Sequence, residues 1–255
     1  MSVGRAAVTL LGLIVLWQAV VWLAATPPYI LPGPGPVAAV FAAQPAMLLG
    51  HAAVTAVEIA AGLACGAVLG IASALSLAHF RPARRWLLPL LVVSQAIPVF
   101  ALAPILMLWL GYGMASKIAM ATLIIYFPVT AAFYDGLRRT EPGWLDLART
   151  MNGTRRAVLR HIRVPAALPA LGSGMRVATA VAPIGAVVGE WVGSGAGLGY
   201  LMLHANGRMQ IDVMFAALFT LAAIAVALYF AVDAVIRRCL PWQPETSPTM
   251  EAAPR

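Results

Sequence analysis

Residues 53–77 read AVTAVEIAAGLACGAVLGIASALSL, and Glu58 is the only charged side chain among them. A bilayer core about 30 Å thick is crossed by roughly 20 apolar residues in a helix. This stretch is therefore long enough and apolar enough to span a membrane. Because backbone groups in lipid must be satisfied within the protein, a helix is the expected structure.

Five further stretches pass the same test, so the sequence predicts an all-α, polytopic membrane protein with about six transmembrane helices. The composition agrees, since 62% of the 255 residues are hydrophobic, 10% are charged and the mean hydropathy is +0.87. Soluble domains contain about 45–50% apolar and about 25% charged residues, so a soluble globular protein is excluded. The other predicted spans are Ala6–Ala25, Trp86–Leu110, Ile118–Tyr134, Ala166–Trp191 and Val213–Ile236.

The basic residues indicate the orientation of these spans. Fourteen of the 17 lie in segments that face one side, namely the two ends of the chain, the loop after the second span and the loop after the fourth. Lys117 and Arg208 fall in loops on the other side, and Arg176 lies inside the fifth span. Because cytoplasmic loops carry the excess of Lys and Arg, both termini are expected in the cytoplasm. The net charge of +8 is interpreted as a topology signal, and nucleic acid is not an expected partner.

The sequence lacks the residue patterns for ATP binding, metal binding and a disulfide framework. The only lysine is Lys117, in the context ASKI, so the chain contains no Walker A loop for ATP phosphates. The cysteines, Cys65 and Cys239, lie far apart, and the four histidines show no ligand spacing. We therefore predict no catalytic residue, metal or cofactor in this chain.

The loop between the fourth and fifth spans, 141–165, reads EPGWLDLARTMNGTRRAVLRHIRVP. Pro142 suits a first helical turn, and Asn152-Gly153 tolerates the left-handed conformation that ends a helix. Thr154 can cap a second helix, which is expected to end before Pro165. The result is a short, basic helical hairpin. Its arginines either enforce topology and bind anionic lipid, or dock on a cytoplasmic partner, and the spacing leaves both readings open.

This loop resembles the EAA loop of permease subunits of binding-protein-dependent ABC importers. Asp146 stands where that family usually has Glu, and Asn152 stands at the usual loop glycine. Other stretches resemble the family's branch for sulfonates, taurine, nitrate and thiamine-precursor pyrimidines, most of all the hydroxymethylpyrimidine permeases. These stretches are Pro165–Pro169, Gly174–Val177, Gly189–Trp191 and Gly195–Tyr200.

The resemblance implies a type I ABC importer permease in a bacterial inner membrane. Two permease subunits, expected to be a homodimer, would each present the hairpin to a cytoplasmic ATPase subunit that binds ATP. An external binding protein would deliver a small polar solute, with membrane lipid around the complex. The residues expected to couple to the ATPase are Asp146, Ala148, Asn152, Gly153, Arg156 and Pro165.

Polar and aromatic groups within the spans are candidates for the substrate pathway, although interhelical packing is an equally ordinary role for them. Glu190 is the leading candidate for a gate or a substrate contact, because it precedes the glycine-rich run 193–199 where a helix gives way to an outer loop. The predicted pathway residues are Ser94, Gln95, Tyr126, Phe127 and Glu190. An ion-gradient-driven secondary transporter and an intramembrane enzyme remain as less favoured functions.

Smaller features complete the predicted organisation. Residues 1–240 form one transmembrane domain, and the proline-rich tail 241–255 is expected to be disordered. Prolines in the third span favour a kinked or broken helix. In the second span, a small residue every fourth position predicts close packing against a neighbouring helix. That stripe consists of Gly62, Gly66, Gly70 and Ala74.

Overall fold

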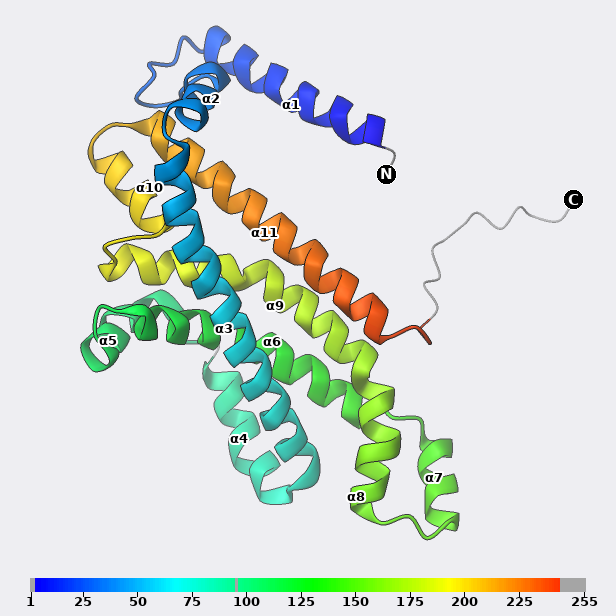
Figure 1. Cartoon of the computed structure of the whole chain (residues 1–255). Helices are drawn as coiled ribbons and strands as arrows, with labels where there is room; N and C mark the ends of the chain where they lie inside the picture. The colour runs from blue at the N-terminus through cyan, green and yellow to red at the C-terminus, as the bar shows by residue number, and fades with distance from the viewer. Residues whose placement is uncertain (1–2, 95, 244–255) are drawn as a thin grey trace, which may run out of the picture. The chain divides into compact units, whose positions relative to one another are not determined.

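The computed structural model describes residues 3–94 and 96–243, and the regular structure in this part of the chain is helical. The predicted disordered tail, beyond Gln243, and the pathway residue Gln95 lie outside the described residues. The helices are shown in Figure 1. In chain order they are α1 (Val3–Leu23), α2 (Pro34–Ala43), α3 (Pro45–His79), α4 (Arg81–Ser94), α5 (Val99–Leu110), α6 (Met114–Arg138), α7 (Pro142–Thr150), α8 (Arg155–Val158), the π-helical turn η1 (Leu159–Arg163), α9 (Val164–Gly193), α10 (Leu198–Gly207) and α11 (Ile211–Cys239).

Four of the predicted spans lie within single helices, namely α3, α6, α9 and α11. The first predicted span, Ala6–Ala25, extends two residues beyond α1, whose segment Ala7–Leu23 is one of the shorter apolar helices. Four helical segments are long and apolar enough to cross a membrane, and a fifth span is present if α4 and α5 form one broken span. The four are α3, α6, the continuous segment Arg155–Gly193 and α11. The predicted all-helical membrane architecture is confirmed, and the described residues contain four or five candidate spans where the sequence predicted about six.

The predicted third span, Trp86–Leu110, is two helices rather than one. Helix α4 ends at Ser94, and α5 begins at Val99 after Pro98, whose φ of −59° and ψ of 118° are not helical. A proline lacks the N–H that a helix needs and drives the residue before it out of the helical region. The break expected from the prolines of this span therefore falls at Pro98.

The described chain divides into two compact units. The first consists of residues 1–66, 97–125 and 181–227. Its apolar core brings α2 together with α10 and the beginning of α11, through buried side chains that include Val37, Leu198 and Ala216. Trp17 of α1 packs against this core, with its ring stacked 6.0 Å from that of Phe215.

The second unit consists of the described residues within 67–96, 126–180 and 228–243. Its core joins the end of α3, the helix α4 and the end of α6, and Ala167 of α9 packs with them. The largest fully buried side chains in it are Leu77, Phe133 and Leu137. The hairpin predicted at 141–165 belongs to this unit.

The glycine stripe of the second span packs against α6, as predicted. A Cβ added at Gly66 would lie 2.5 Å from Ile125 Cγ2, and one added at Gly70 would lie 2.9 Å from Val129. Real Cβ atoms do not approach neighbours this closely, so these positions require glycine. Small residues let two helix backbones come close together, which replaces the missing hydrophobic driving force within a membrane.

The prediction that the second hairpin helix ends before Pro165 is wrong. Helix α8 continues through the π-turn into α9, and Pro165 lies within this continuous helix. In the π-turn the N–H of Val164 bonds to the carbonyl of Leu159, five residues earlier. A proline ring collides with the carbonyl four residues before it in an α-helix, and a wider turn just ahead of Pro165 moves that carbonyl aside.

Candidate functional site

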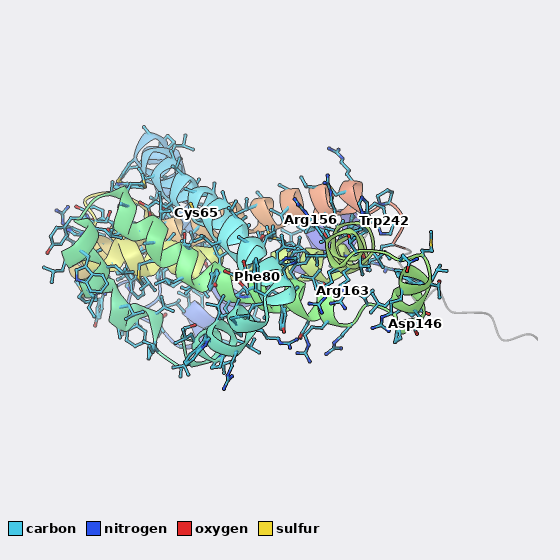
Figure 2. The ribbon with its side chains drawn as sticks, turned by 90° about the horizontal axis from the view of Figure 1, so that it is seen from below. Cys65, Phe80, Asp146, Arg156, Arg163 and Trp242 are labelled. Carbon is cyan, nitrogen blue, oxygen red and sulfur yellow. The ribbon has the colours of Figure 1, made fainter. Side chains whose placement is uncertain are left out.

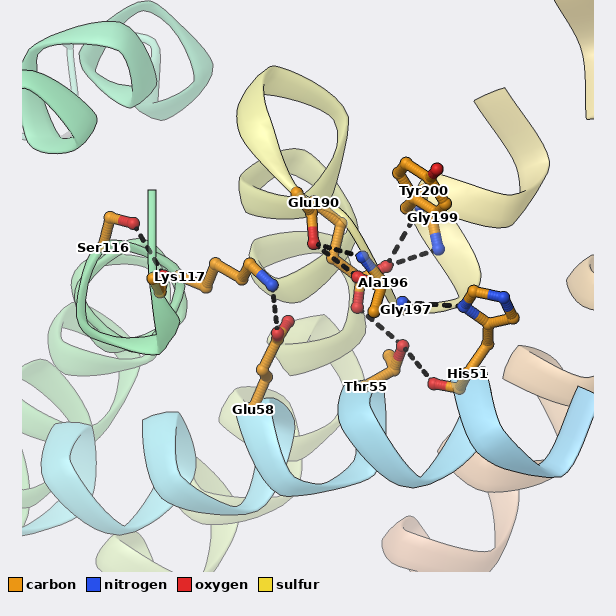
Figure 3. A network of polar contacts seen from close by, with 12 residues as sticks. His51, Thr55, Glu58, Ser116, Lys117, Glu190, Ala196, Gly197, Gly199 and Tyr200 are labelled. Carbon is orange, nitrogen blue, oxygen red and sulfur yellow. Dashed lines mark hydrogen bonds and ion pairs between the residues drawn. The ribbon is translucent and has the colours of Figure 1, made fainter. Parts of the chain in front are cut away.

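A buried ion pair lies within the first unit (Figure 3). The ammonium nitrogen of Lys117 is 2.8 Å from Oε1 of Glu58, and the two side chains are 7% and 0% exposed. Lys117 does not lie in an outer loop, as the sequence predicted, but in the first turn of α6. Gly189 of α9 lies against the same turn, since a Cβ there would be 3.2 Å from Lys117 Cα. The ion pair therefore sits where α3, α6 and α9 meet.

Glu58 depends on this partner. Its second oxygen, Oε2, is buried and accepts no hydrogen bond from the described part of the chain. A carboxylate removed from water costs free energy unless it is paired. Lys117 supplies the compensating charge in the described structure.

Glu190, the predicted gate residue, holds the start of α10. Its Oε1 accepts a hydrogen bond from Thr55 Oγ1 at 2.6 Å, and its Oε2 accepts from the backbone N–H groups of Gly199 and Tyr200. The first N–H groups of a helix have no partner within the helix, and a carboxylate is favoured there by the helix dipole. A Cβ at Gly197, whose φ is +117°, would overlap the Glu190 carboxylate.

Two residues of α3 complete this network, and sequence reasoning missed both. His51 Nδ1 accepts a hydrogen bond from the Gly197 N–H at 3.0 Å, and Thr55 Oγ1 accepts one from the Leu198 N–H at 2.8 Å. His51, Thr55 and Glu58 follow one another at intervals of four and three residues, which places them on one face of a helix. That spacing is the signal in the sequence that could have identified the network.

The network is closed in the described structure. Glu190 is 1% exposed and Glu58 and Thr55 are fully buried, so the charged and polar groups contact one another rather than an open cavity. The arrangement holds α3, α6, α9 and α10 in a fixed geometry. It gives the Glu190 carboxylate three structural partners, whereas its contact with substrate stays a prediction.

The remaining predicted pathway residues belong to the second unit. Tyr126 of α6 is half-buried and donates a hydrogen bond from its hydroxyl to Ser73 Oγ of α3 at 2.7 Å. Phe127, its neighbour, is also half-buried. Ser94, at the end of α4, is exposed and donates to the Leu91 carbonyl at 2.8 Å. Tyr126 therefore bridges two helices, and its place in a substrate pathway stays a prediction.

The hairpin predicted for coupling has the expected turn. Helix α7 begins with Pro142 and is followed by Asn152 in the left-handed region at φ +55°. The Gly153 N–H donates to the Ala148 carbonyl at 2.8 Å, which satisfies a carbonyl at the end of α7. Thr154 caps α8 by accepting from the Ala157 N–H at 3.2 Å, as predicted.

Three of the predicted coupling residues, Ala148, Gly153 and Pro165, line one cavity of the hairpin. Asp146 is exposed and pairs with Arg149 at 2.7 Å, and Ala148 is buried. A cavity of about 580 Å³ separates α7 from the segment that leads into α9, and Pro165 lies on its wall. Exposed apolar side chains line this cavity, namely Trp144, Leu147, Met151 and Trp242. Figure 2 shows Asp146 and Trp242 in this part of the chain.

Comparison with known proteins decides the family. Residues 66–241 match the family described as "Binding-protein-dependent transport system inner membrane component". This chain is a member of that family. The matched region contains the whole hairpin, the Glu190 loop and all of α11.

Curated relatives that are named as transport permeases match this permease over most of their length. A "Probable ABC transporter permease protein" of Haemophilus influenzae is 56% identical over 226 residues, which is 89% of this chain and 92% of that protein. The "Formylaminopyrimidine transport permease protein ThiX" of Halalkalibacterium halodurans is 36% identical, covering 91% of this chain and 93% of that protein. The permease is thus a multi-pass membrane subunit of an ABC importer, and ATP hydrolysis falls to a separate subunit.

The fold agrees with this assignment. The permease of the MetNI methionine ABC transporter, in an inward-facing conformation, matches with a TM-score of 0.61 at 22% identity. The match covers 76% of this chain and 98% of the MetNI chain. At 22% sequence identity, the match is evidence about the fold alone. It shows that this permease has the fold of an ABC importer chain.

Proposed function

We propose that the permease forms the membrane pathway for a small heterocyclic solute, a thiamine-precursor pyrimidine, and couples it to ATP through the hairpin 141–165. Two copies pair in a bacterial inner membrane with both termini in the cytoplasm. Each copy docks on a cytoplasmic ATPase subunit, and an extracytoplasmic binding protein supplies the solute. The observation that carries the proposal is the family membership together with the hairpin's exposed, apolar-lined surface.

The pyrimidine assignment is supported by similarity to ThiX, whose printed name specifies formylaminopyrimidine transport. A second heterocycle competes with it. The "Riboflavin transport system permease protein RibX" of Chloroflexus aurantiacus is 37% identical over 238 residues, a similarity equal to that of ThiX. Both solutes are planar and nitrogen-containing, so a pathway lined by uncharged polar and aromatic groups such as Tyr126 and Phe127 suits either.

Uptake by the reconstituted transporter distinguishes these solutes. We expect proteoliposomes containing the permease, its ATPase and its cognate binding protein to accumulate formylaminopyrimidine or hydroxymethylpyrimidine when ATP is present inside. Riboflavin and taurine serve as matched competitors. Accumulation of riboflavin alone would transfer the assignment to that solute, and uptake driven by an ion gradient without ATP would contradict the importer mechanism.

The coupling role of the hairpin is tested at Asp146. We expect Asp146→Lys to abolish ATP-driven uptake and release the ATPase during purification, because it reverses the charge of the side chain 65% exposed at the centre of α7. The measurement is the amount of ATPase that co-purifies with the permease and the uptake rate.

Asp135→Lys is the matched control. Asp135 is also exposed and also pairs with an arginine three residues later, Arg138, but it lies at the end of α6 outside the hairpin. This variant should keep its ATPase and its uptake. Equal behaviour of the two variants would refute a specific contact by Asp146.

A further inference from the structure

Four arginines surround one cavity of about 500 Å³ in the second unit. Arg84 comes from α4, and Arg149, Arg155 and Arg163 come from the hairpin. His79, the last residue of α3, also lines the cavity. We propose that this cavity binds the phosphate headgroup of an anionic phospholipid and so ties the hairpin to the membrane surface.

The charge of the cavity is largely uncompensated. Arg149 is paired with Asp146 at 2.7 Å. Among the described residues, Arg84, Arg155 and Arg163 have no carboxylate within ion-pair distance. Like charges gathered in one space repel each other, and a phosphate group that accepts hydrogen bonds from several guanidinium groups removes this repulsion. The geometry thus favours a phosphate-bearing ligand over a neutral one.

An apolar surface continues from the arginine cavity. A second cavity of about 350 Å³ is lined by Leu75, Ser76, Phe80 and Arg156, and it shares His79 and Leu159 with the first. Phe80 and Arg163 can be followed in Figure 2. A ligand that fits both cavities carries an anionic head beside an apolar part, which is the chemistry of a phospholipid rather than of free phosphate.

The position along α3 also favours lipid. This helix is long and apolar enough to cross a membrane, and it ends at His79, directly at the cavity. Phe80 and Trp86 follow it and are 56% and 73% exposed. Exposed aromatic side chains beside arginines at the end of a membrane helix are typical of the headgroup region, and basic pockets there bind anionic headgroups.

The inference goes beyond the proposed function and does not depend on it. Arg156, the arginine assigned to the ATPase, lines the second cavity, whereas the headgroup contacts Arg84, Arg155 and Arg163 in the first. A headgroup held by Arg84 together with Arg155 and Arg163 would connect the α3–α4 turn to the hairpin. The composition of the membrane would then influence how firmly the hairpin is held.

Native mass spectrometry of the full-length permease, purified with its associated subunits, tests the site. We expect the wild type to retain phosphatidylglycerol in preference to phosphatidylcholine. Arg84→Gln combined with Arg163→Gln should weaken phosphatidylglycerol binding about 30-fold, since each arginine near an anionic headgroup contributes about a fivefold preference.

The matched control is Arg85→Gln combined with Arg160→Gln, which removes the same charge from neighbouring positions that do not line the cavity. It should bind phosphatidylglycerol as the wild type does. Arg84→Lys with Arg163→Lys keeps the charge and should retain most of the binding, which verifies that these positions tolerate substitution.

Three results would overturn the inference. The first is equal loss of lipid in the cavity and control variants, which would indicate a diffuse charge effect. The second is displacement by inorganic phosphate with no preference for lipid, which would indicate a soluble anion. The third is loss of the ATPase from the cavity variants while phosphatidylglycerol is still retained, which would make these arginines a protein contact.

Discussion

Replacing Lys117 with methionine is expected to lower the melting temperature of the purified permease by about 6–20 °C. The substitution leaves the Glu58 carboxylate fully buried with no cation beside it. Removing one partner of a buried ion pair costs about 3–5 kcal/mol, and each kcal/mol corresponds to about 2–4 °C in a chain of this size. Methionine has nearly the length of lysine, so packing changes little and the effect reports the lost charge.

A double substitution distinguishes the effect of the lost charge from the effect of the changed side-chain shape. In Glu58→Met combined with Lys117→Met, neither member of the ion pair remains, and apolar replacements of a buried pair are often neutral or stabilising. The double variant should therefore recover most of the melting temperature lost by Lys117→Met. Arg208→Met removes a positive charge from an exposed position and serves as the control. If the double variant melts as low as the single one, the ion pair does not explain the loss.

Gly185→Leu is expected to prevent accumulation of folded permease in the membrane. A Cβ at Gly185 of α9 would lie 2.6 Å from the Cα of Ala121 on α6, and Gly62 of α3 packs against the same alanine. The obstacle is backbone, which cannot rotate away as a side chain can. The helices would have to separate, and the close approach that stabilises them would be lost. Fluorescence-detected size exclusion of detergent extracts measures the remaining folded protein.

Two glycine-to-alanine substitutions, one at this contact and one away from it, are expected to change the stability in different directions. Gly185→Ala adds one methyl group at the contact and should lower the melting temperature, because overpacking costs about 1–3 kcal/mol. Gly50→Ala makes the same change within α3 where no atom lies within 4 Å, and there alanine should leave stability unchanged or raise it. Equal effects of the two alanines would show that α6 and α9 are not in tight contact.

The two predictions concern the same part of the first unit. Lys117 and Ala121 are one helical turn apart on α6, and Gly189 and Gly185 of α9 lie against them in turn. The glycines bring α9 close to α6, and this proximity shields the ion pair from water. Shielding makes an unpaired charge costly, so the small residues and the ion pair support each other energetically.

The sequence alone determined the class of the protein and most of its helices. Runs of apolar residues dictate membrane helices because unpaired backbone groups are too costly in lipid. The turn of the hairpin was likewise predictable, because Asn152 and Thr154 act on their immediate neighbours and need no distant partner. Interactions between neighbouring residues of this kind can be predicted directly from the sequence.

Tertiary structure decided what the polar residues do. Glu190 was predicted as a gate from its place before a glycine-rich run, but in the folded chain it accepts hydrogen bonds from Gly199 and Tyr200 across that run and from Thr55 of α3, 135 residues away. The sequence used Lys117 to exclude an ATP-binding loop and placed it in an outer loop, whereas the folded chain buries it against Glu58. Such pairings depend on which helix faces meet, and that is set by packing across the whole unit rather than by neighbouring residues.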